Sequence, residues 1–337
     1  MEIALASAAF VVAAICAGLM GFAIQRGATC TVAAMDEIVA RRRFNRLISM
    51  VEASVWVVGG LLIAQYLDVL PNMPSGYSVN GYTISGGILL GLGAYVNRAC
   101  VFGAIARLGS GEWAYVATPI GFYVGCLTVG SVFAPAAPQK LGYGSPVLQG
   151  SLWIALLFAA FLLFRLARVL LAVSADPTRS TFGRRVRHLL TVRVWSPHAA
   201  TAVIGVTFLV MLLLVGAWAY TDVLADFARG MAGSLVARTA LLGMLFLGAV
   251  VGGETAGRFR STRVAPVQLL KCFVGGMLMG WGSLLIPGGN DGLILVGMPL
   301  LWPYAWVAFL AMCVSIGAAL CVEQARSTTE ARQLHTN

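Results

Sequence analysis

The sequence predicts an all-α integral membrane protein with about nine transmembrane helices, short re-entrant or broken helices, and an inverted-topology repeat. Three observations predict this fold class. Of 337 residues, 59% are hydrophobic and 11% are charged, and the mean hydropathy is +0.85; a soluble domain carries about 25% charged residues. Apolar runs long enough to span a bilayer recur along the whole chain. Two distant parts of the chain also share one pattern of glycines.

Nine apolar runs define the expected spans, within a single transmembrane domain over 1–337. They lie at 3–25, 47–67, 83–97, 113–133, 149–171, 199–219, 235–253, 266–286 and 300–321. Several runs are shorter than the roughly 20 residues that a bilayer core needs. Two of them, 83–97 and 266–286, lead into Gly-rich, partly polar segments. Because non-helical backbone is tolerated in a membrane only where protein or a water cavity shields it, we expect broken helices there.

The arginines predict the orientation in the membrane. Three loops at 41–46, 179–193 and 258–263 are rich in arginine, whereas the loops at 68–82, 134–148 and 220–234 together hold only Lys140 and Arg229. Positive charge collects in cytoplasmic loops, so we expect an outside N-terminus, a cytoplasmic basic loop at 172–198 and a cytoplasmic tail at 322–337. Orientation explains the net charge of +10, and nucleic-acid binding is therefore not expected. Since no Lys or Arg precedes Arg26, the N-terminus is expected to stay attached as a first span.

An internal repeat appears when the chain is shifted by 189 residues. Gly86-Gly87-x-x-x-Gly91-x-Gly93 then falls on Gly275-Gly276-x-x-x-Gly280-x-Gly282, among nine identities in 30 aligned residues. On the predicted topology the two copies are inverted, with a first repeat at 1–133, a connector helix at 149–171 and a second repeat at 199–321. Inverted repeats with interrupted helices are typical of transporters, whose site lies near the midplane where the interruptions meet.

Two cysteines lie next to expected helix interruptions. Cys100 follows the first glycine run, and Cys30 follows Gln25-Arg26-Gly27 after the first span. A thiol at a helix break can donate a weak hydrogen bond to a soft ligand, although a cysteine is also an ordinary small buried residue. Arg26 is costly in hydrocarbon, so it either faces an anionic substrate or extends to a lipid headgroup.

The segment Pro287-Gly288-Gly289-Asn290-Asp291-Gly292 is the symmetry mate of the segment around Cys100, and Gly289 occupies the position of Cys100. Gly288 and Gly289 allow close backbone approach, and a following helix start would attract an anion. Asp291 would repel an anion unless it faces away or is neutralised. An ordinary turn at the outer surface is the alternative interpretation. We include Asn290 and Asp291, with Gly27, among the candidate site residues.

Neither a metal site nor a cofactor site is expected. The seven cysteines form no C-x-x-C pair, and the three histidines lie in the basic loop, at its edge or in the tail, so the spacing fits no zinc site. No nucleotide-binding motif is present. Glu254 is interpreted as a solvated helix end or as part of a loop salt bridge, rather than as a proton relay. The cysteines interpreted as packing residues are Cys16, Cys126, Cys272, Cys313 and Cys321.

With these residues the sequence resembles the YeeE/YedE family of bacterial membrane proteins, which includes thiosulfate transporters. The resemblance is carried by Gly21-x-x-x-Gln25-Arg26-Gly27-x-x-Cys30, by the glycine run that leads to Cys100, and by the second Gly-Gly copy. It implies an hourglass-shaped inverted-repeat bundle in which cysteines pass a sulfur oxyanion inward by S–H hydrogen bonding. Cys30 and Cys100 match two such cysteines, and Gly289 stands where a third is expected. The resemblance also implies a small cytosolic sulfur-carrier protein as a partner.

Together these observations favour an importer in the bacterial inner membrane rather than an enzyme. Its expected substrate is a small sulfur-containing anion, with thiosulfate as the first candidate, passed along a narrow path of cysteine thiols and broken-helix ends; its other contacts are with membrane lipid. Two alternatives stay open. One is a membrane sulfur-transfer enzyme that uses Cys30 or Cys100, which needs an activated thiol and a nearby base. The other is a non-catalytic subunit of a larger membrane complex.

Overall fold

The structure, a computed structural model, describes residues 7–149, 152–175, 194–230 and 235–336. These residues are overwhelmingly helical and form no β-strand, apart from one isolated bridge between Tyr77 and Lys140, so the all-α prediction is confirmed. Eight helical segments are long and apolar enough to cross a membrane. They are Ala8–Arg41, Asn45–Tyr66, Gly81–Gly109, Trp113–Phe133, Pro197–Val215, Val236–Thr255, Pro266–Leu285 and Pro303–Ser327. The chain is therefore a multi-pass membrane protein.

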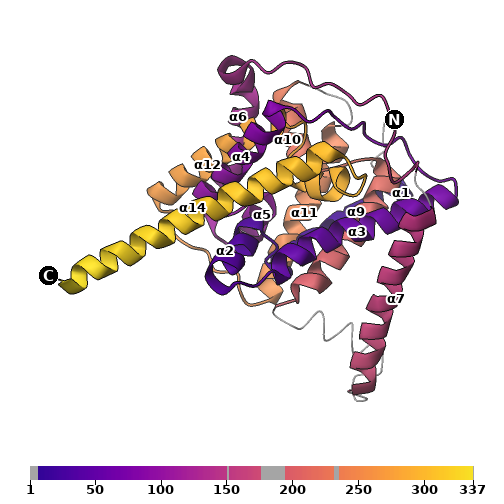
Figure 1. Cartoon of the computed structure of the whole chain (residues 1–337), viewed down its shortest axis with the longest axis horizontal. Coiled ribbons are helices and arrows are strands. Elements are labelled where there is room, and N and C mark those ends of the chain that lie inside the picture. Colours follow the sequence, from indigo (N-terminus) through magenta and orange to yellow (C-terminus); the bar gives the residue numbers. More distant parts are fainter. Residues whose placement is uncertain (1–6, 150–151, 176–193, 231–234, 337) are drawn as a thin grey trace.

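The ninth expected span, at 149–171, corresponds to α7 (Leu152–Ala175). The apolar stretch of α7 that the structure describes, Trp153–Arg165, is shorter than a full span. Figure 1 shows α7 projecting from one end of the bundle. One charged cluster links it to the bundle: the buried Glu52 carboxylate lies 3.1 Å from Arg165 of α7 and 2.5 Å from Nδ1 of His198.

Two sets of helices follow one another with the same alternation of long and short helices. The first set is α1 (Ala8–Gly27), α2 (Thr31–Arg41), α3 (Asn45–Tyr66), α4 (Gly81–Asn97), α5 (Val101–Gly109), η1 (Trp113–Val116) and α6 (Ala117–Phe133). The second set is α9 (Pro197–Val215), α10 (Tyr220–Ala228), α11 (Leu235–Thr255), α12 (Pro266–Leu285), α13 (Asn290–Gly292), η3 (Leu293–Gly297) and α14 (Pro303–Thr336). The starts of α2 and α10 are 189 positions apart, as are those of α5 and α13, which is the offset of the glycine pattern. The division into inverted membrane repeats stays a prediction.

The repeated glycines bring helix backbones into contact. Gly86 of α4 lies against Gly282 of α12, and Gly93 lies against Gly275, so the two helices run antiparallel. A Cβ placed on Gly93 would come within 2.6 Å of the Gly275 carbonyl oxygen. Small residues let helix backbones approach closely in a membrane protein, and these contacts hold the broken helices α4 and α12 together.

The final helix is longer than the sequence indicated. The last apolar run ends at 321, but α14 continues to Thr336 and leaves the bundle at the C-terminal end (Figure 1). Beyond the apolar part, Glu323 of α14 binds Arg98 through both guanidinium nitrogens, at 2.8 and 2.5 Å. The predicted tail is thus a continuation of a membrane helix, and this ion pair joins its first turn to the end of α4.

Candidate functional site

The starts of four short helices lie against one another in the interior of the bundle. Cys30 precedes α2, Cys100 precedes α5, Ala219 precedes α10 and Gly289 precedes α13. Contacts join them: α5 touches α13, and α10 touches α13. The polar side chains at these starts are almost completely buried, as in Thr31 and Thr221. Because buried polar groups are costly in a membrane protein, these helix starts are the candidate functional site.

Backbone turns create these helix starts. After α1 the chain turns at Ala28, whose φ is 47°, and after α4 it turns at Arg98, whose φ is 59°. The break after α4 is held by Asn97, whose Nδ2 donates to the Ala99 carbonyl at 2.8 Å and whose Oδ1 accepts from the Thr118 hydroxyl at 2.9 Å. Because Cys30 and Cys100 then take extended conformations, α2 and α5 each begin anew inside the bundle.

Cys30 and Cys100 form a reciprocal pair at the starts of α2 and α5. The Thr31 backbone N–H donates to Sγ of Cys100 at 3.2 Å, and the Cys100 N–H donates to Sγ of Cys30 at 3.4 Å. Both thiols are free, and Cys100 is fully buried. Gly103 makes the approach possible, since a Cβ there would lie 2.6 Å from Sγ of Cys30. Each sulfur thus occupies an N–H group at a helix start, which is the kind of group that attracts anions.

A second polar pair lies at the start of α10. The Asp291 carboxylate accepts a hydrogen bond from the Thr221 N–H at 3.2 Å and another from the Thr221 hydroxyl. Asp291 is 2% exposed. It therefore supplies from another helix the capping oxygen that the start of α10 needs. We call Thr221 and Asp291 the hydroxyl–carboxyl pair, and Cys30 and Cys100 the thiol pair.

Two side chains connect the pairs. Nδ2 of Asn290 lies 3.5 Å from the Thr31 hydroxyl, and the Tyr220 hydroxyl donates to the Val101 carbonyl at 3.4 Å. Asn290 is completely buried, and its Oδ1 has no hydrogen-bond partner. Since the two ends of an amide can exchange places, Asn290 can offer either a free acceptor or free N–H donors to a ligand between the pairs.

The structure brings together most of the residues that the sequence singled out. Cys30, Cys100, Gly289, Asn290 and Asp291 all lie at the meeting helix starts. The alternative of an ordinary surface turn for the segment around Asp291 is wrong, because its polar side chains are buried. Gly288 lines a cavity next to this site.

Arg26 and Gly27 lie at the end of α1, beside other helices. The Arg26 guanidinium donates to the Thr255 hydroxyl of α11 at 2.8 Å and stacks over Phe22. Its side chain is fully buried in protein, so the alternative in which Arg26 extends to a lipid headgroup is wrong. Gly27 packs against α9, where an added Cβ would meet Ala200 at 2.3 Å.

Sequence reasoning missed Thr31, Tyr220, Thr221 and Asp222. The last three fall in a stretch that hydropathy places in an outer loop at 220–234. One available signal was the offset of 189, which places Tyr220 and Thr221 opposite Thr31 and Val32. This offset would have predicted a short helix with polar residues at the position in the second repeat that corresponds to α2.

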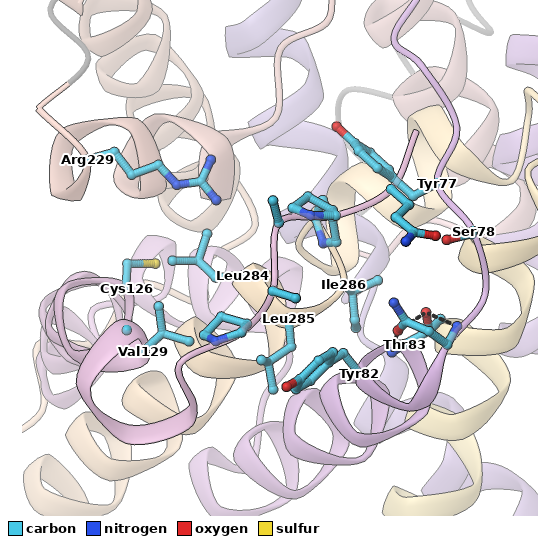
Figure 2. A pocket seen from close by; sticks show the side chains of 18 of the residues that line it. Tyr77, Ser78, Tyr82, Thr83, Cys126, Val129, Arg229, Leu284, Leu285 and Ile286 are labelled. Carbon is cyan, nitrogen blue, oxygen red and sulfur yellow. Dashed lines mark hydrogen bonds between the residues drawn. The ribbon is translucent and has the colours of Figure 1, made fainter. Parts of the chain in front are cut away.

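Two adjoining cavities lead to the hydroxyl–carboxyl pair. The nearer one, of about 240 Å³, is lined by Asp222, Gly288 and Gly292. The second, of about 340 Å³, shares Tyr77, Arg229, Leu284 and Pro287 with it. Figure 2 shows Arg229 reaching over Cys126 and Leu284 on one side of this second cavity, opposite Tyr77 and Thr83. Cys126, interpreted from the sequence as a packing residue, therefore also lines a cavity.

A third cavity lies on the side of α2. It has a volume of about 710 Å³. Charged and polar groups line it, namely Asp36, Glu37, Arg41, Asn45, Arg46, Ser196 and His198. Arg46 donates to the carbonyl of Ala28, in the turn that precedes Cys30, at 3.4 Å. Cavities thus lie on two sides of the bundle, one beside α10 and one beside α2.

A multi-pass bundle whose broken helices meet at a buried polar site has the architecture of a membrane transporter. The chain belongs to the sulphur transport family, which matches residues 26–320, and the resemblance to YeeE/YedE proteins is confirmed. It is 24% identical over 353 residues to the thiosulfate transporter TsuA of Escherichia coli (strain K12), in an alignment that covers 94% of this chain and 96% of that protein.

Proposed function

We propose that the protein imports a small sulfur-containing anion, with thiosulfate as the first candidate, through the centre of the bundle. The observation that carries this proposal is the thiol pair, in which two buried sulfurs occupy N–H groups at two helix starts. The name of the relative from Escherichia coli supports the choice of thiosulfate.

The chemistry of the thiol pair suits such a substrate. A thiol is both a weak donor and a weak acceptor. When an anion arrives, the N–H groups of Thr31 and Cys100 can turn from sulfur to the anion while each S–H donates to it. A polarisable sulfur surface also suits the terminal sulfur of thiosulfate. Binding thus replaces the weak N–H to sulfur hydrogen bonds with charge-assisted hydrogen bonds to the anion, and no covalent bond forms.

The direct test is uptake by the purified chain alone in liposomes. Labelled thiosulfate should accumulate inside, and unlabelled thiosulfate should compete better than sulfate does. Absence of uptake by the correctly folded chain would favour the subunit hypothesis. Release of transferred sulfur in place of intact thiosulfate would favour the sulfur-transfer enzyme.

We propose that the protein lies in the bacterial inner membrane with its N-terminus outside and its C-terminus in the cytoplasm. The arginine asymmetry of the loops supports this orientation. The two cavities near Asp222 would then open outside, and the cavity near His198 would open to the cytoplasm. The small cytosolic sulfur-carrier protein, also a proposal, would receive the anion there. Most of the basic loop at 172–198 lies outside the described residues.

Cysteine labelling tests the orientation. The only exposed native cysteine that the structure describes is Cys321, so Arg185→Cys is made together with Cys321→Ser. We expect position 185 to resist a membrane-impermeant thiol reagent in intact cells and to react after permeabilisation. Reaction in intact cells would overturn the orientation and, with it, the inverted repeat.

Arg26 is proposed to assist substrate capture through its charge. We expect Arg26→Gln to weaken uptake more than Arg26→Lys, with the larger change in KM, because lysine keeps the positive charge. Since the guanidinium is buried against Thr255, thermal stability is measured in parallel. Equal stability loss in both variants, with an unchanged KM, would assign Arg26 to the packing of α1 on α11.

A further inference from the structure

The two halves of the site use different chemistry at matching positions. At the offset of 189, Ala219 corresponds to Cys30 and Gly289 corresponds to Cys100. All four residues directly precede short helices. The thiol pair therefore has no sulfur counterpart at the starts of α10 and α13.

The hydroxyl–carboxyl pair fills the space of the missing thiol. A Cβ placed on Gly289 would lie 2.2 Å from the Thr221 hydroxyl oxygen, 2.7 Å from the Thr221 Cβ and 3.0 Å from Oδ1 of Asp291. These distances are well inside ordinary contact, so a cysteine at 289 and this pair exclude each other. The hydroxyl–carboxyl pair thus stands in the second repeat where the thiol pair stands in the first.

Asp291 in its charged form opposes the passage of an anion. Its carboxylate accepts the N–H and the hydroxyl hydrogen of Thr221, which are the donors that a passing anion would need. Its negative charge also repels the substrate. A protonated Asp291 is neutral and carries an O–H donor, so it can bond to the anion and leave the Thr221 N–H available to it.

Among the residues that the structure describes, no cation pairs directly with the Asp291 carboxylate. Its hydrogen bonds come from Thr221, and the nearby Arg238 is paired with Asp226. Asp291 faces Tyr220 and Asp222. The other charged and titratable groups near Asp222 are Asp226, Arg229, Arg238, Cys126 and Tyr304. Next to Asp291, the buried Oδ1 of Asn290 has no hydrogen-bond partner. Asp222 lines the cavity of about 240 Å³, so a proton can reach the pair from that side.

We propose that Asp291 carries a proton together with each anion, which makes the protein a proton–anion symporter. The inference rests on the proposed function. Asp291 takes a proton from the cavity lined by Asp222, releases Thr221, and donates its O–H to the anion. The anion passes to the thiol pair, and the proton leaves toward the same side. One proton offsets one negative charge of the substrate, which lowers the cost of moving an anion against an inside-negative potential.

The test follows proton and anion together. The full chain is placed in liposomes that contain a pH-sensitive dye, and a thiosulfate gradient is applied. We expect wild-type vesicles to acidify inside as labelled thiosulfate enters, with at least about one proton for each anion. Asp291→Asn should carry at least nine-tenths fewer protons for each thiosulfate that enters, whatever its uptake rate, because an amide cannot release a proton. Asp68→Asn makes the same change at an exposed position and should behave as wild type.

The outcomes separate this inference from the proposed function. Thiosulfate entry without acidification in the wild type, or full acidification with Asp291→Asn, would overturn proton coupling and leave the proposed function intact. No thiosulfate entry in any assay would refute the proposed function itself. Thr221→Val is a second variant that retains the carboxyl. Since Thr221 stabilises the charged carboxylate, its loss should extend proton-coupled uptake to higher pH, and an unchanged pH profile would contradict the role of the pair.

Discussion

Cys100→Ala is expected to lower the initial rate of thiosulfate uptake by about one to two orders of magnitude, and Cys100→Ser should retain part of the rate. Sγ of Cys100 is fully buried and accepts the N–H of Thr31. Alanine removes the donor and acceptor, whereas serine keeps an O–H of similar size. A hydrogen bond to a charged group contributes about 1.5–3 kcal/mol, and about 1.4 kcal/mol corresponds to a factor of ten. The measurement is uptake per folded protein in liposomes.

Matched cysteine variants serve as controls. Cys30→Ala should follow Cys100→Ala, because Sγ of Cys30 accepts the Cys100 N–H. Cys16→Ala on α1 and Cys313→Ala on α14 should leave the rate of thiosulfate uptake nearly unchanged. Complete loss with both Cys100→Ala and Cys100→Ser, at normal membrane abundance, would favour covalent sulfur transfer, since an unactivated serine cannot replace a thiolate. Full uptake in both variants would make Cys100 a packing residue.

Hydropathy and glycine spacing were sufficient to predict most of the fold. Long apolar runs become spanning helices because backbone groups in lipid must be bonded within the segment. The two apolar runs that lead into polar, glycine-rich sequence, 83–97 and 266–286, correspond to α4 and α12. Each of these helices is followed by a short helix. The length of α14 was not predictable in this way, because the residues after 321 are mostly polar and hydropathy marks only the apolar part of a helix.

The site was predicted where the sequence itself is unusual. Cys30, Cys100 and Asp291 are polar or reactive residues at interruptions of apolar runs. Thr221 was missed because α10 has only nine residues, and a helix shielded by protein needs no run of spanning length. From the sequence, Arg26 could face either an anionic substrate or a lipid headgroup. Burial against Thr255 depends on how α1 packs on α11, which is a tertiary contact with no local signal.

Gly248→Ala is expected to destabilise the protein strongly, whereas Gly243→Ala on the same helix should be neutral or stabilising. A Cβ at Gly248 would lie 1.8 Å from the carbonyl oxygen of Gly18 on α1, but a Cβ at Gly243 has nothing within 4 Å. Overpacking costs about 1–3 kcal/mol, whereas alanine in an exposed helix position gains up to about 1 kcal/mol over glycine. Because the Gly18 oxygen belongs to the backbone, α1 and α11 must move apart, and Cys30, which follows α1, should move with them.

The thermal midpoint of unfolding in detergent should fall for Gly248→Ala and should stay the same or rise for Gly243→Ala. Uptake per folded protein should be lowered only by Gly248→Ala. Equal midpoints for the two variants would contradict the close packing of α1 on α11.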